Sequence, residues 1–195
     1  MEASSAYPQL KKLFDGQQPL SDEEWGLYAS KVVVREFAAQ ELITQPGKRE
    51  EYISFIERGS VRMYALQEGK EICVTFRFQG EFVSSYASFL TGQPSRLYLE
   101  AMEDAVLYGM RHADLQQLYG LSKDGERLGR LNAEGLYIEQ AMHLEALLMD
   151  PPYMRFQQLL KAKPVWFQRV PQKYLASYLN ITPETFSRYK RKLME

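Results

Sequence analysis

Short segments rich in Val, Ile, Phe and Tyr follow one another between residues 32 and 110, with glycines at the breaks between them. β-Branched and aromatic residues favour strands, and short strands joined by glycine turns are typical of an antiparallel roll or sandwich. The segments are VVVREFA, ELITQ, YISFIERG, SVRMYALQ, KEICVTFRFQG and LYLEAMEDAVLYGM, and the glycines are Gly47, Gly59, Gly69 and Gly80. Gly69 is expected to close a hairpin within ALQEGKEI, because a tight hairpin turn needs positive φ. This part of the chain is therefore predicted to form an antiparallel β-roll.

A long amphipathic pattern follows these strands. Residues 112–120, HADLQQLYG, are expected to form a short helix, and a second helix is expected from about Asp124 to Met149. One stripe of the second helix repeats at a–d spacing, which is typical of helix pairs. The candidate dimer residues on this stripe are Leu128, Leu131, Gly135, Ile138, Met142 and Met149. Further leucines lie off the stripe, so we expect one flank to pack on the roll and the other on a second copy. The alternative is a single buried helix in a monomer.

Helix-starting and helix-ending residues mark other parts of the chain. Ser21 precedes three acidic residues and is a candidate N-cap for a helix near the start. Pro151 and Pro152 are expected to end the long helix and to form a hinge. The segment YMRFQQLLKA then predicts another helix, and VWFQRV, residues 165–170, predicts a short β-type run.

Residues 170–193, VPQKYLASYLNITPETFSRYKRKL, are predicted to form two short helices joined by a tight turn. Leu175 and Leu179 form the inner stripe of the first helix. Asn180 lies in the turn, where positive φ is needed, and Asn tolerates that conformation better than most residues. Thr182 is expected to cap the second helix and Pro183 to be its first residue. This is the signature of a helix-turn-helix, a common DNA-binding unit.

The second helix of this pair has two distinct faces. Phe186, Tyr189 and Leu193 recur at helical spacing and are expected to point inward. The opposite face is polar, and its candidate base-contacting residues are Glu184, Ser187 and Arg188, because Arg can hold guanine O6 and N7 while Glu can accept from cytosine N4. Candidate phosphate contacts, which position the protein without specifying sequence, are Lys173, Thr182, Thr185, Lys190, Arg191 and Lys192.

Charge is divided unevenly along the chain. The formal net charge is −1, yet residues 151–195 carry +7 and residues 1–150 carry −8. A basic segment attached to an acidic body is typical of a module that meets a polyanion such as nucleic acid. The alternative for a run of charges is a solvated helix face.

Composition argues against several other classes of protein. With 195 residues, 45% of them hydrophobic, the chain can bury a sizeable core. Cys73 is the only cysteine, so neither an internal disulfide nor a cysteine-based metal cluster is expected. The absence of a long apolar run or a signal-peptide pattern predicts a cytoplasmic protein without a membrane partner. Two scattered histidines, one cysteine and no glycine-rich phosphate loop give no catalytic set, so we do not expect an enzyme.

The order of a β-roll, a long helix, a hinge and a helix-turn-helix resembles the Crp/Fnr family of bacterial transcription regulators, from about residue 10 to 193. ITPETFSRYKRKL is similar to the family's recognition helix, and YISFIERGSVRMYALQEGKEICVTFRFQGEFV resembles its cyclic-nucleotide-binding roll. The resemblance implies an α+β fold with an N-terminal antiparallel roll of the double-stranded β-helix or jelly-roll type. A long dimerisation helix and a winged-helix-type helix-turn-helix with a truncated wing would follow. The implied domains are residues 1–121, 122–150 and 151–195.

The effector segment departs from the pattern of cyclic-AMP-binding members. In those members the Gly–acid pair is followed by a glycine and a carboxylate for the ribose, and then by an Arg-Ser pair for the cyclic phosphate. Ser84 and Ser85 stand at the glycine and carboxylate positions here, and the Arg-Ser pair is reversed. A buried cyclic phosphate needs a charged partner such as arginine. Reversing the pair moves the arginine by one position along a strand, so its side chain is expected to face the other side. Cyclic AMP is therefore not expected as the effector. The candidate effector pocket comprises Gly80, Glu81, Ser84, Ser85, Ser95 and Arg96.

The other sensors of the family are not indicated either. An iron–sulfur cluster needs several cysteines, and nothing in the sequence supports haem ligation by His112 or His143. Cys73 is expected to be buried and inert in a strand. We therefore expect no resident cofactor, and a small effector of another kind, or none.

These inferences predict a homodimeric, sequence-specific DNA-binding transcription regulator. Its expected partners are double-stranded DNA, a second copy of the chain and RNA polymerase. The alternative is a ligand-binding or protein-interaction module whose basic C-terminal helix docks an acidic partner without reading DNA sequence.

Overall fold

The computed structural model describes residues 7–121 and 123–192. Internal contacts divide the chain into two compact units. The roll unit contains the described residues up to Met63 together with Phe76–Glu134, and the helical unit contains Tyr64–Thr75 together with the described residues from Gly135 onward. The domain boundaries expected after residues 121 and 150 stay a prediction.

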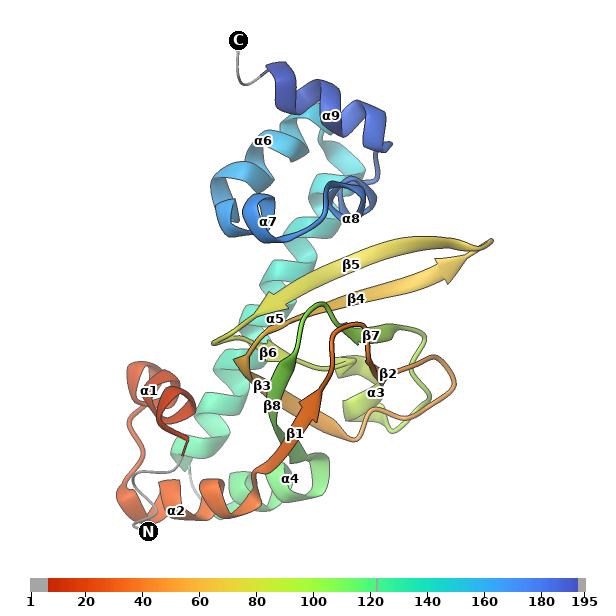
Figure 1. Cartoon of the computed structure of the whole chain (residues 1–195). Coiled ribbons are helices and arrows are strands. Elements are labelled where there is room, and N and C mark those ends of the chain that lie inside the picture. The colour runs from red at the N-terminus through yellow and green to blue at the C-terminus, as the bar shows by residue number, and fades with distance from the viewer. Residues whose placement is uncertain (1–6, 122, 193–195) are drawn as a thin grey trace. The chain divides into compact units, whose positions relative to one another are not determined.

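Eight strands form two four-stranded antiparallel sheets in the described part of the chain. The first sheet has the order β1-β8-β3-β6, with β1 (Val33–Phe37), β8 (Ala105–Arg111), β3 (Tyr52–Arg58) and β6 (Phe82–Val83). The second has the order β2-β7-β4-β5, with β2 (Leu42–Thr44), β7 (Tyr98–Ala101), β4 (Ser60–Gln67) and β5 (Lys70–Phe78). The predicted antiparallel roll and the α+β class are confirmed (Figure 1).

The glycine turns form where the sequence placed them. Gly69 has φ +77° in the β4–β5 hairpin, and Gly59 has φ +94° between β3 and β4. A Cβ atom at Gly59 would lie 2.7 Å from the backbone oxygen of Asp104, so a side chain there would meet both a strained backbone and a clash.

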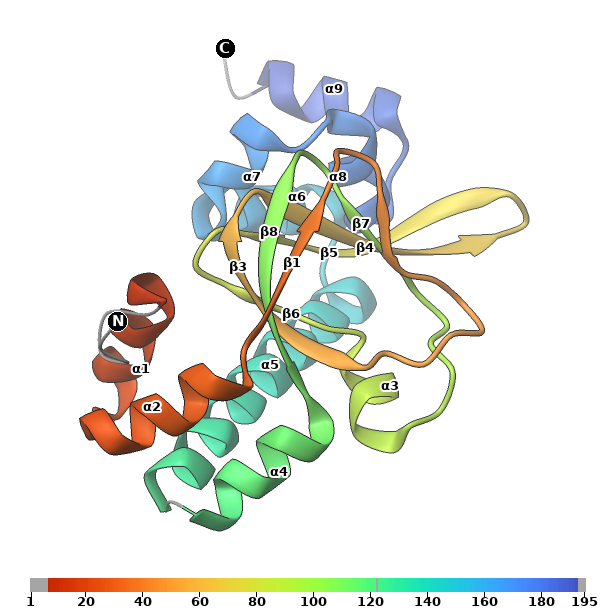
Figure 2. The same ribbon diagram turned by 60° about the horizontal axis from the view of Figure 1, so that its bottom comes forward.

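Helices cover one end of the roll, as Figures 1 and 2 show. They are α1 (Pro8–Gln17), α2 (Asp22–Lys31), α4 (His112–Leu121) and the first part of α5 (Lys123–Met149), whereas α3 (Tyr86–Thr91) lies between β6 and β7 in the chain. Their apolar faces share a core in which Trp25 is fully buried and contacts Phe14 edge-on, with ring centres 6.1 Å apart. Phe55 of β3 and Leu118 of α4 belong to the same core.

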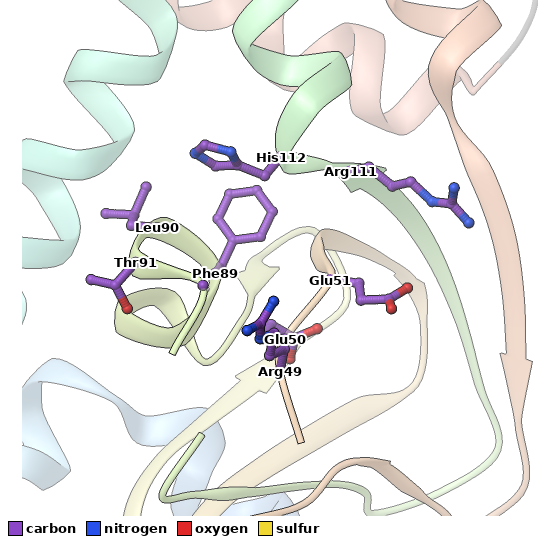
Figure 3. Close-up of a pocket in the computed structure, with 9 residues that line it drawn as sticks. Arg49, Glu50, Glu51, Phe89, Leu90, Thr91, Arg111 and His112 are labelled. Carbon is purple, nitrogen blue, oxygen red and sulfur yellow. The ribbon is translucent and has the colours of Figure 1, made fainter. Parts of the chain in front are cut away.

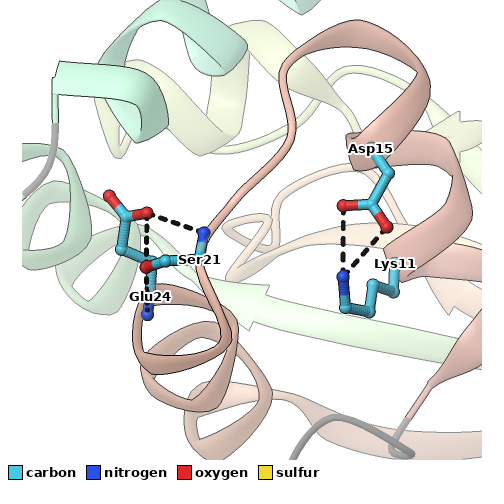
Figure 4. Close-up of polar contacts among 4 residues, drawn as sticks. All are labelled: Lys11, Asp15, Ser21 and Glu24. Carbon is cyan, nitrogen blue, oxygen red and sulfur yellow. Dashed lines mark hydrogen bonds and ion pairs between the residues drawn. The ribbon is translucent and has the colours of Figure 1, made fainter.

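Local polar contacts stabilise the first two helices (Figure 4). Ser21 caps α2 as predicted, because its hydroxyl accepts from the backbone N–H of Glu24 at 3.2 Å while the Glu24 carboxylate accepts from the Ser21 N–H at 2.9 Å. This reciprocal pair is a capping box. In α1, Lys11 and Asp15 are one helical turn apart and form an ion pair of 2.9 Å.

The helical unit contains the rest of α5 and four shorter helices, α6 (Pro152–Ala162), α7 (Pro164–Arg169), α8 (Gln172–Tyr178) and α9 (Pro183–Lys192). The long helix ends at Met149, one residue before the proline pair, as predicted. The expected β-type run at residues 165–170 is wrong, because residues 165–169 belong to α7 and only Val170, its C-cap, is extended. Pro164 supplies a first helical position with its φ already fixed, and Trp166 is buried 5.1 Å from the ring of Tyr178.

Candidate nucleic-acid interface and effector region

Helices α8 and α9 and the turn between them form the predicted helix-turn-helix. Asn180 adopts φ +52°, the left-handed conformation expected for it. The N–H of Ile181 donates to the carbonyl of Ala176 at 3.0 Å, which ends α8. The hydroxyl of Thr182 then accepts from the N–H of Thr185 at 3.2 Å, so Thr182 is the N-cap of α9, as predicted. The turn thereby sets the direction in which α9 leaves α8.

An aromatic core holds the inner face of α9. Phe186 is 1% exposed, with ring centres of Phe156 and Phe167 at 5.2 and 5.7 Å. Tyr189, one turn further on, lies 5.0 Å from the ring of Tyr153. The inward orientation predicted for Phe186 and Tyr189 is confirmed, and Leu193 lies outside the described residues. Rings packed on several sides resist rotation of α9 about its axis.

A buried arginine, which sequence reasoning missed, joins three helices of this unit. Arg155 of α6 is 9% exposed, and its guanidinium donates to the carbonyl of Leu179 at 2.9 and 3.2 Å and to the carbonyl of Asp150 at 2.8 Å. It therefore satisfies carbonyl groups at the ends of α8 and α5, which a helix cannot bond internally. Only its place in the apolar segment YMRFQQLL could have signalled a buried cation.

The outer face of α9 is exposed and polar. It presents Glu184, Ser187, Arg188 and Arg191 to solvent, spaced at three and four residues. Lys190 and Lys192 are also exposed, and the ammonium of Lys192 lies 4.7 Å from the ring centre of Tyr153. Of the remaining candidate phosphate contacts, Lys173 and Thr182 are exposed and Thr185 is half-buried. The helix thus combines a bond-forming face with a cationic end.

Glu184 stays ionised on this face. Its pKa is held below the ordinary value, first by a hydrogen bond from its own backbone N–H and then by one from the Thr182 side chain. An acceptor in the first turn of a helix also suits the positive end of the helix dipole. Glu184 is therefore a fixed acceptor beside the donors of Ser187 and Arg188.

The second half of α5 exposes an unusual amount of apolar surface. Ile138, Met142 and Met149 of the predicted stripe are 55%, 65% and 72% exposed, and Gly135 is also exposed. Tyr137, Leu144 and Leu148 are exposed beside them. Large apolar side chains gathered along one helix mark an interaction surface.

The first half of the same stripe behaves differently. Leu128 is only 2% exposed and packs within the core of the roll unit, so we remove it from the candidate dimer surface. Leu131 is half-buried. The heptad spacing extends through both halves of the helix, but spacing alone does not reveal that helices α1 and α2 cover its beginning.

The predicted effector segment begins with a turn. Gly80 has φ +88°, and its N–H donates to the carbonyl of Ile56 at 2.9 Å. The carboxylate of Glu81 accepts from the N–H of Phe78 at 2.8 Å. Gly80 and Glu81 therefore shape the connection between β5 and β6.

The serines of this segment bond to one another and to the roll. Ser85 and Ser95 are each 4% exposed, and their hydroxyl oxygens lie 2.8 Å apart. The hydroxyl of Ser84 donates to the carbonyl of Tyr52 at 3.0 Å, while Arg96 is exposed. The structure brings Ser85 and Ser95 together but leaves no buried carboxylate or arginine at these positions. The segment therefore does not fit the ribose and cyclic phosphate of cyclic AMP.

A cavity of about 600 Å³ opens elsewhere on the roll unit, between the start of β3, the end of α3 and the start of α4 (Figure 3). Its lining residues are Arg49, Glu50, Glu51, Phe89, Leu90, Thr91, Gly92, Arg111 and His112. This volume suits a small molecule. Sequence reasoning missed the cavity, because three separate segments form it and only the pairing of β3 with β8 brings Arg111 toward Tyr52.

Polar contacts fix the wall of this cavity. Glu50 is 6% exposed, and its carboxylate accepts from the hydroxyl of Thr44 at 2.7 Å and from the N–H of Tyr52 at 3.2 Å. The N–H of Glu50 donates to the Ser88 hydroxyl at 3.0 Å. The Arg111 guanidinium donates to the Tyr52 hydroxyl at 3.1 and 3.2 Å. The wall is therefore preformed and carries charge of both signs.

The two histidines and the cysteine have ordinary surroundings. His112 lies edge-on to Phe89 at 5.2 Å, and His143 stacks on Tyr178 at 4.1 Å. Cys73 is 3% exposed in β5, as expected. Among the described residues, no cluster of three or more His, Cys, Asp or Glu side chains could hold a metal ion. No helix within the same residues has both the length and the apolar character that a membrane crossing requires.

Comparisons with known proteins point to one kind of architecture. Residues 34–121 match the family model of the cyclic nucleotide-binding domain. No curated protein matches the chain. FixK2 from Bradyrhizobium japonicum is 20% identical with a TM-score of 0.71, and the alignment covers 84% of each chain.

Two further solved structures share the fold. CLP, the c-di-GMP responsive global regulator of Xanthomonas campestris, is 19% identical with a TM-score of 0.68, over 89% of this chain and 92% of that one. A protein from Eubacterium rectale, described as a transcriptional regulator of the Crp/Fnr family, is 14% identical with a TM-score of 0.67, over 90% and 84% of the two chains. At these identities the likeness establishes the fold.

Proposed function

We propose that this chain, which has a cyclic nucleotide-binding domain over residues 34–121 and the fold of the Crp/Fnr transcription regulators, is a homodimeric regulator that binds DNA sequence-specifically. The relatives that share the fold are regulators and not enzymes, which supports a non-catalytic role. RNA polymerase is the expected further partner in transcription.

The outer face of α9 is the observation that carries this proposal. Glu184, Ser187 and Arg188 point away from the aromatic core, and none of them is buried. An arginine fork and a fixed carboxylate on one helix face offer both the donors and the acceptor that base edges in the major groove require. The cations at the end of the same helix suit the phosphate backbone.

The exposed apolar stripe of α5 supports the homodimer. Ile138, Met142 and Met149 would lose most of their exposed surface against a second copy, with a gain of about 25 cal/mol per Å² buried. A two-fold dimer would present two copies of α9 to successive major grooves about 34 Å apart. We therefore expect a nearly palindromic binding site.

A small effector bound by the roll unit would regulate this activity. The cavity beside α3 and α4 has the volume for it, whereas the Ser85–Ser95 pair removes the groups that would hold cyclic AMP. We therefore expect neither cyclic AMP nor an added metal to raise the melting temperature of the protein. A rise in melting temperature on addition of cyclic AMP would contradict this assignment.

The test is selection of bound duplexes from a random DNA pool by the full-length protein. We expect enrichment of an inverted repeat, and a steep fall in affinity between roughly 50 and 200 mM salt because phosphate contacts release counterions. The selection should be repeated with candidate effectors, including c-di-GMP.

A pool that remains random after selection would overturn sequence-specific binding. If the protein then bound acidic polypeptides as tightly as duplex DNA, the basic helix would be a docking element instead. Enrichment of a single half-site, without its inverted repeat, would support sequence-specific DNA binding but contradict binding as a homodimer.

A further inference from the structure

A serine of the helix-turn-helix bonds directly to the β4–β5 hairpin within the helical unit. The hydroxyl of Ser177 in α8 accepts from the backbone N–H of Cys73 at 2.9 Å and donates to the backbone carbonyl of Glu71 at 2.8 Å. These partners lie more than a hundred positions away in the chain. We call this pair of bonds the Ser177 clamp.

The position of β5 explains why the hairpin offers these two groups. β5 is the last strand in the order β2-β7-β4-β5, so it lies at an edge of this sheet among the described strands. The backbone N–H and C=O groups of residues two apart in a strand point to the same side of that strand. One hydroxyl, which can both donate and accept, therefore satisfies the N–H of Cys73 and the C=O of Glu71 together.

Burial along the hairpin shows which face is covered. Cys73 and Thr75 are 3% and 4% exposed, whereas Ile72, between Cys73 and the turn, is 40% exposed. Successive side chains of a strand point to opposite faces. The face of β5 that carries Cys73 and Thr75 is therefore covered, whereas Ile72 on the other face is exposed.

We propose that Ser177 is a positioning residue that fixes α8, the first helix of the helix-turn-helix, to the β4–β5 hairpin within the helical unit. The link to DNA rests on the proposed function, but the clamp itself does not.

The clamp is tested first through Cys73, the only thiol of the chain. Ser177→Ala removes both hydrogen bonds, so the hairpin should open more often. We expect Cys73 to react with a thiol reagent roughly tenfold faster in this variant under native conditions. Ser30→Ala, the same change at an exposed position of α2, should leave the rate unchanged. Equal rates in wild type and Ser177→Ala would overturn the clamp.

The positioning role is tested on DNA. With the site obtained by selection, Ser177→Ala should weaken binding of the complete inverted repeat roughly tenfold, because two freely moving DNA-binding helices pay more entropy to engage both half-sites. Binding of one half-site should change less than twofold. Unchanged or tighter binding of the inverted repeat would overturn the role. If the wild type selects no sequence, the proposed function fails, while the thiol rates still decide whether the clamp exists.

Discussion

Arg188 has the chemistry and the exposure of a base-reading residue. Its side chain leaves α9 on the solvent side, with the guanidinium carbon 5.7 Å from the ring centre of Tyr189. A two-pronged contact from Arg to guanine is worth about 1–3 kcal/mol of discrimination. Arg188→Ala should therefore weaken binding of the selected site by roughly 5- to 150-fold while sparing random DNA. Titrations of both duplexes at one salt concentration measure this difference.

Lys190 provides the matched comparison on the same helix. It is exposed and carries the same charge, but a lysine is suited to phosphate rather than to a base edge. Lys190→Ala should weaken binding to the selected duplex and to random DNA by the same factor. It should also lower the slope of log affinity against log salt concentration by about one, because one fewer counterion is released. If the Arg188 and Lys190 variants had identical profiles, α9 would contribute charge without reading bases.

The surroundings of His143 predict that the helical unit loses stability in mild acid. Burial and then the charge of Arg155 hold its pKa below the ordinary value of 6.5, with Glu139 opposing them. Because the folded pKa is depressed, the unfolded chain takes up the proton first, so stability should fall as pH drops below about 6.5. His143→Phe keeps a flat ring against Tyr178 without a titrating group. Melting temperatures from pH 7.5 to 5.5 should fall less in this variant, and parallel curves would contradict the assignment.

At the scale of the element, the turn between α8 and α9 depends on Asn180. Its φ of +52° costs most residues about 1–2 kcal/mol, Asn less and glycine almost nothing. Asn180→Ala should therefore lower the free energy of unfolding by about 1 kcal/mol, whereas Asn180→Gly should stay near wild type. Chemical denaturation measures both. Since Asn180 is exposed, loss of packing would not explain a difference, and equal stability of the two variants would show that the turn tolerates any residue.

Elements with local signals could be predicted from the sequence. Ser21, Gly69 and Asn180 each fix backbone geometry through their own chemistry, so the capped helix, the hairpin and the turn appear where the sequence indicated. The inner and outer faces of α9 follow from helical spacing alone, so the candidate base-contacting residues could be assigned to the outer face from the sequence. VWFQRV misled because its β-branched and aromatic residues favour strands, while Pro164 and the burial of Trp166 favour a helix.

Contacts between distant segments could not be predicted in this way. Leu128 and Ile138 both lie on the a–d stripe of the heptad pattern. Leu128 nevertheless packs in the core of the roll unit, whereas Ile138 is exposed. The bonds of Ser177 to the hairpin depend on β5 being an edge strand, which no local pattern states. The cavity beside α3 likewise depends on strand pairing.

At the scale of the whole molecule, the exposed stripe of α5 sets the expected assembly. A charge placed in its middle would have to be buried without a partner in the dimer, at a cost of several kcal/mol on each side. Ile138→Glu tests this most directly. Ile138 is 55% exposed in the single chain, so a glutamate at this position can stay in water while the chain is a monomer. The folded chain should therefore tolerate the change that the dimer does not.

Sedimentation of Ile138→Glu should give a folded monomer at concentrations where the wild type is a dimer. Gln140→Glu is the matched control, since it adds the same charge at an exposed polar position of the same helix. The Ile138 variant should also lose at least tenfold in affinity for the inverted repeat but little for one half-site, because a monomer carries a single α9. A dimer that survived this substitution would place the interface elsewhere on the chain, and the spacing of the two copies of α9 would then no longer follow from α5.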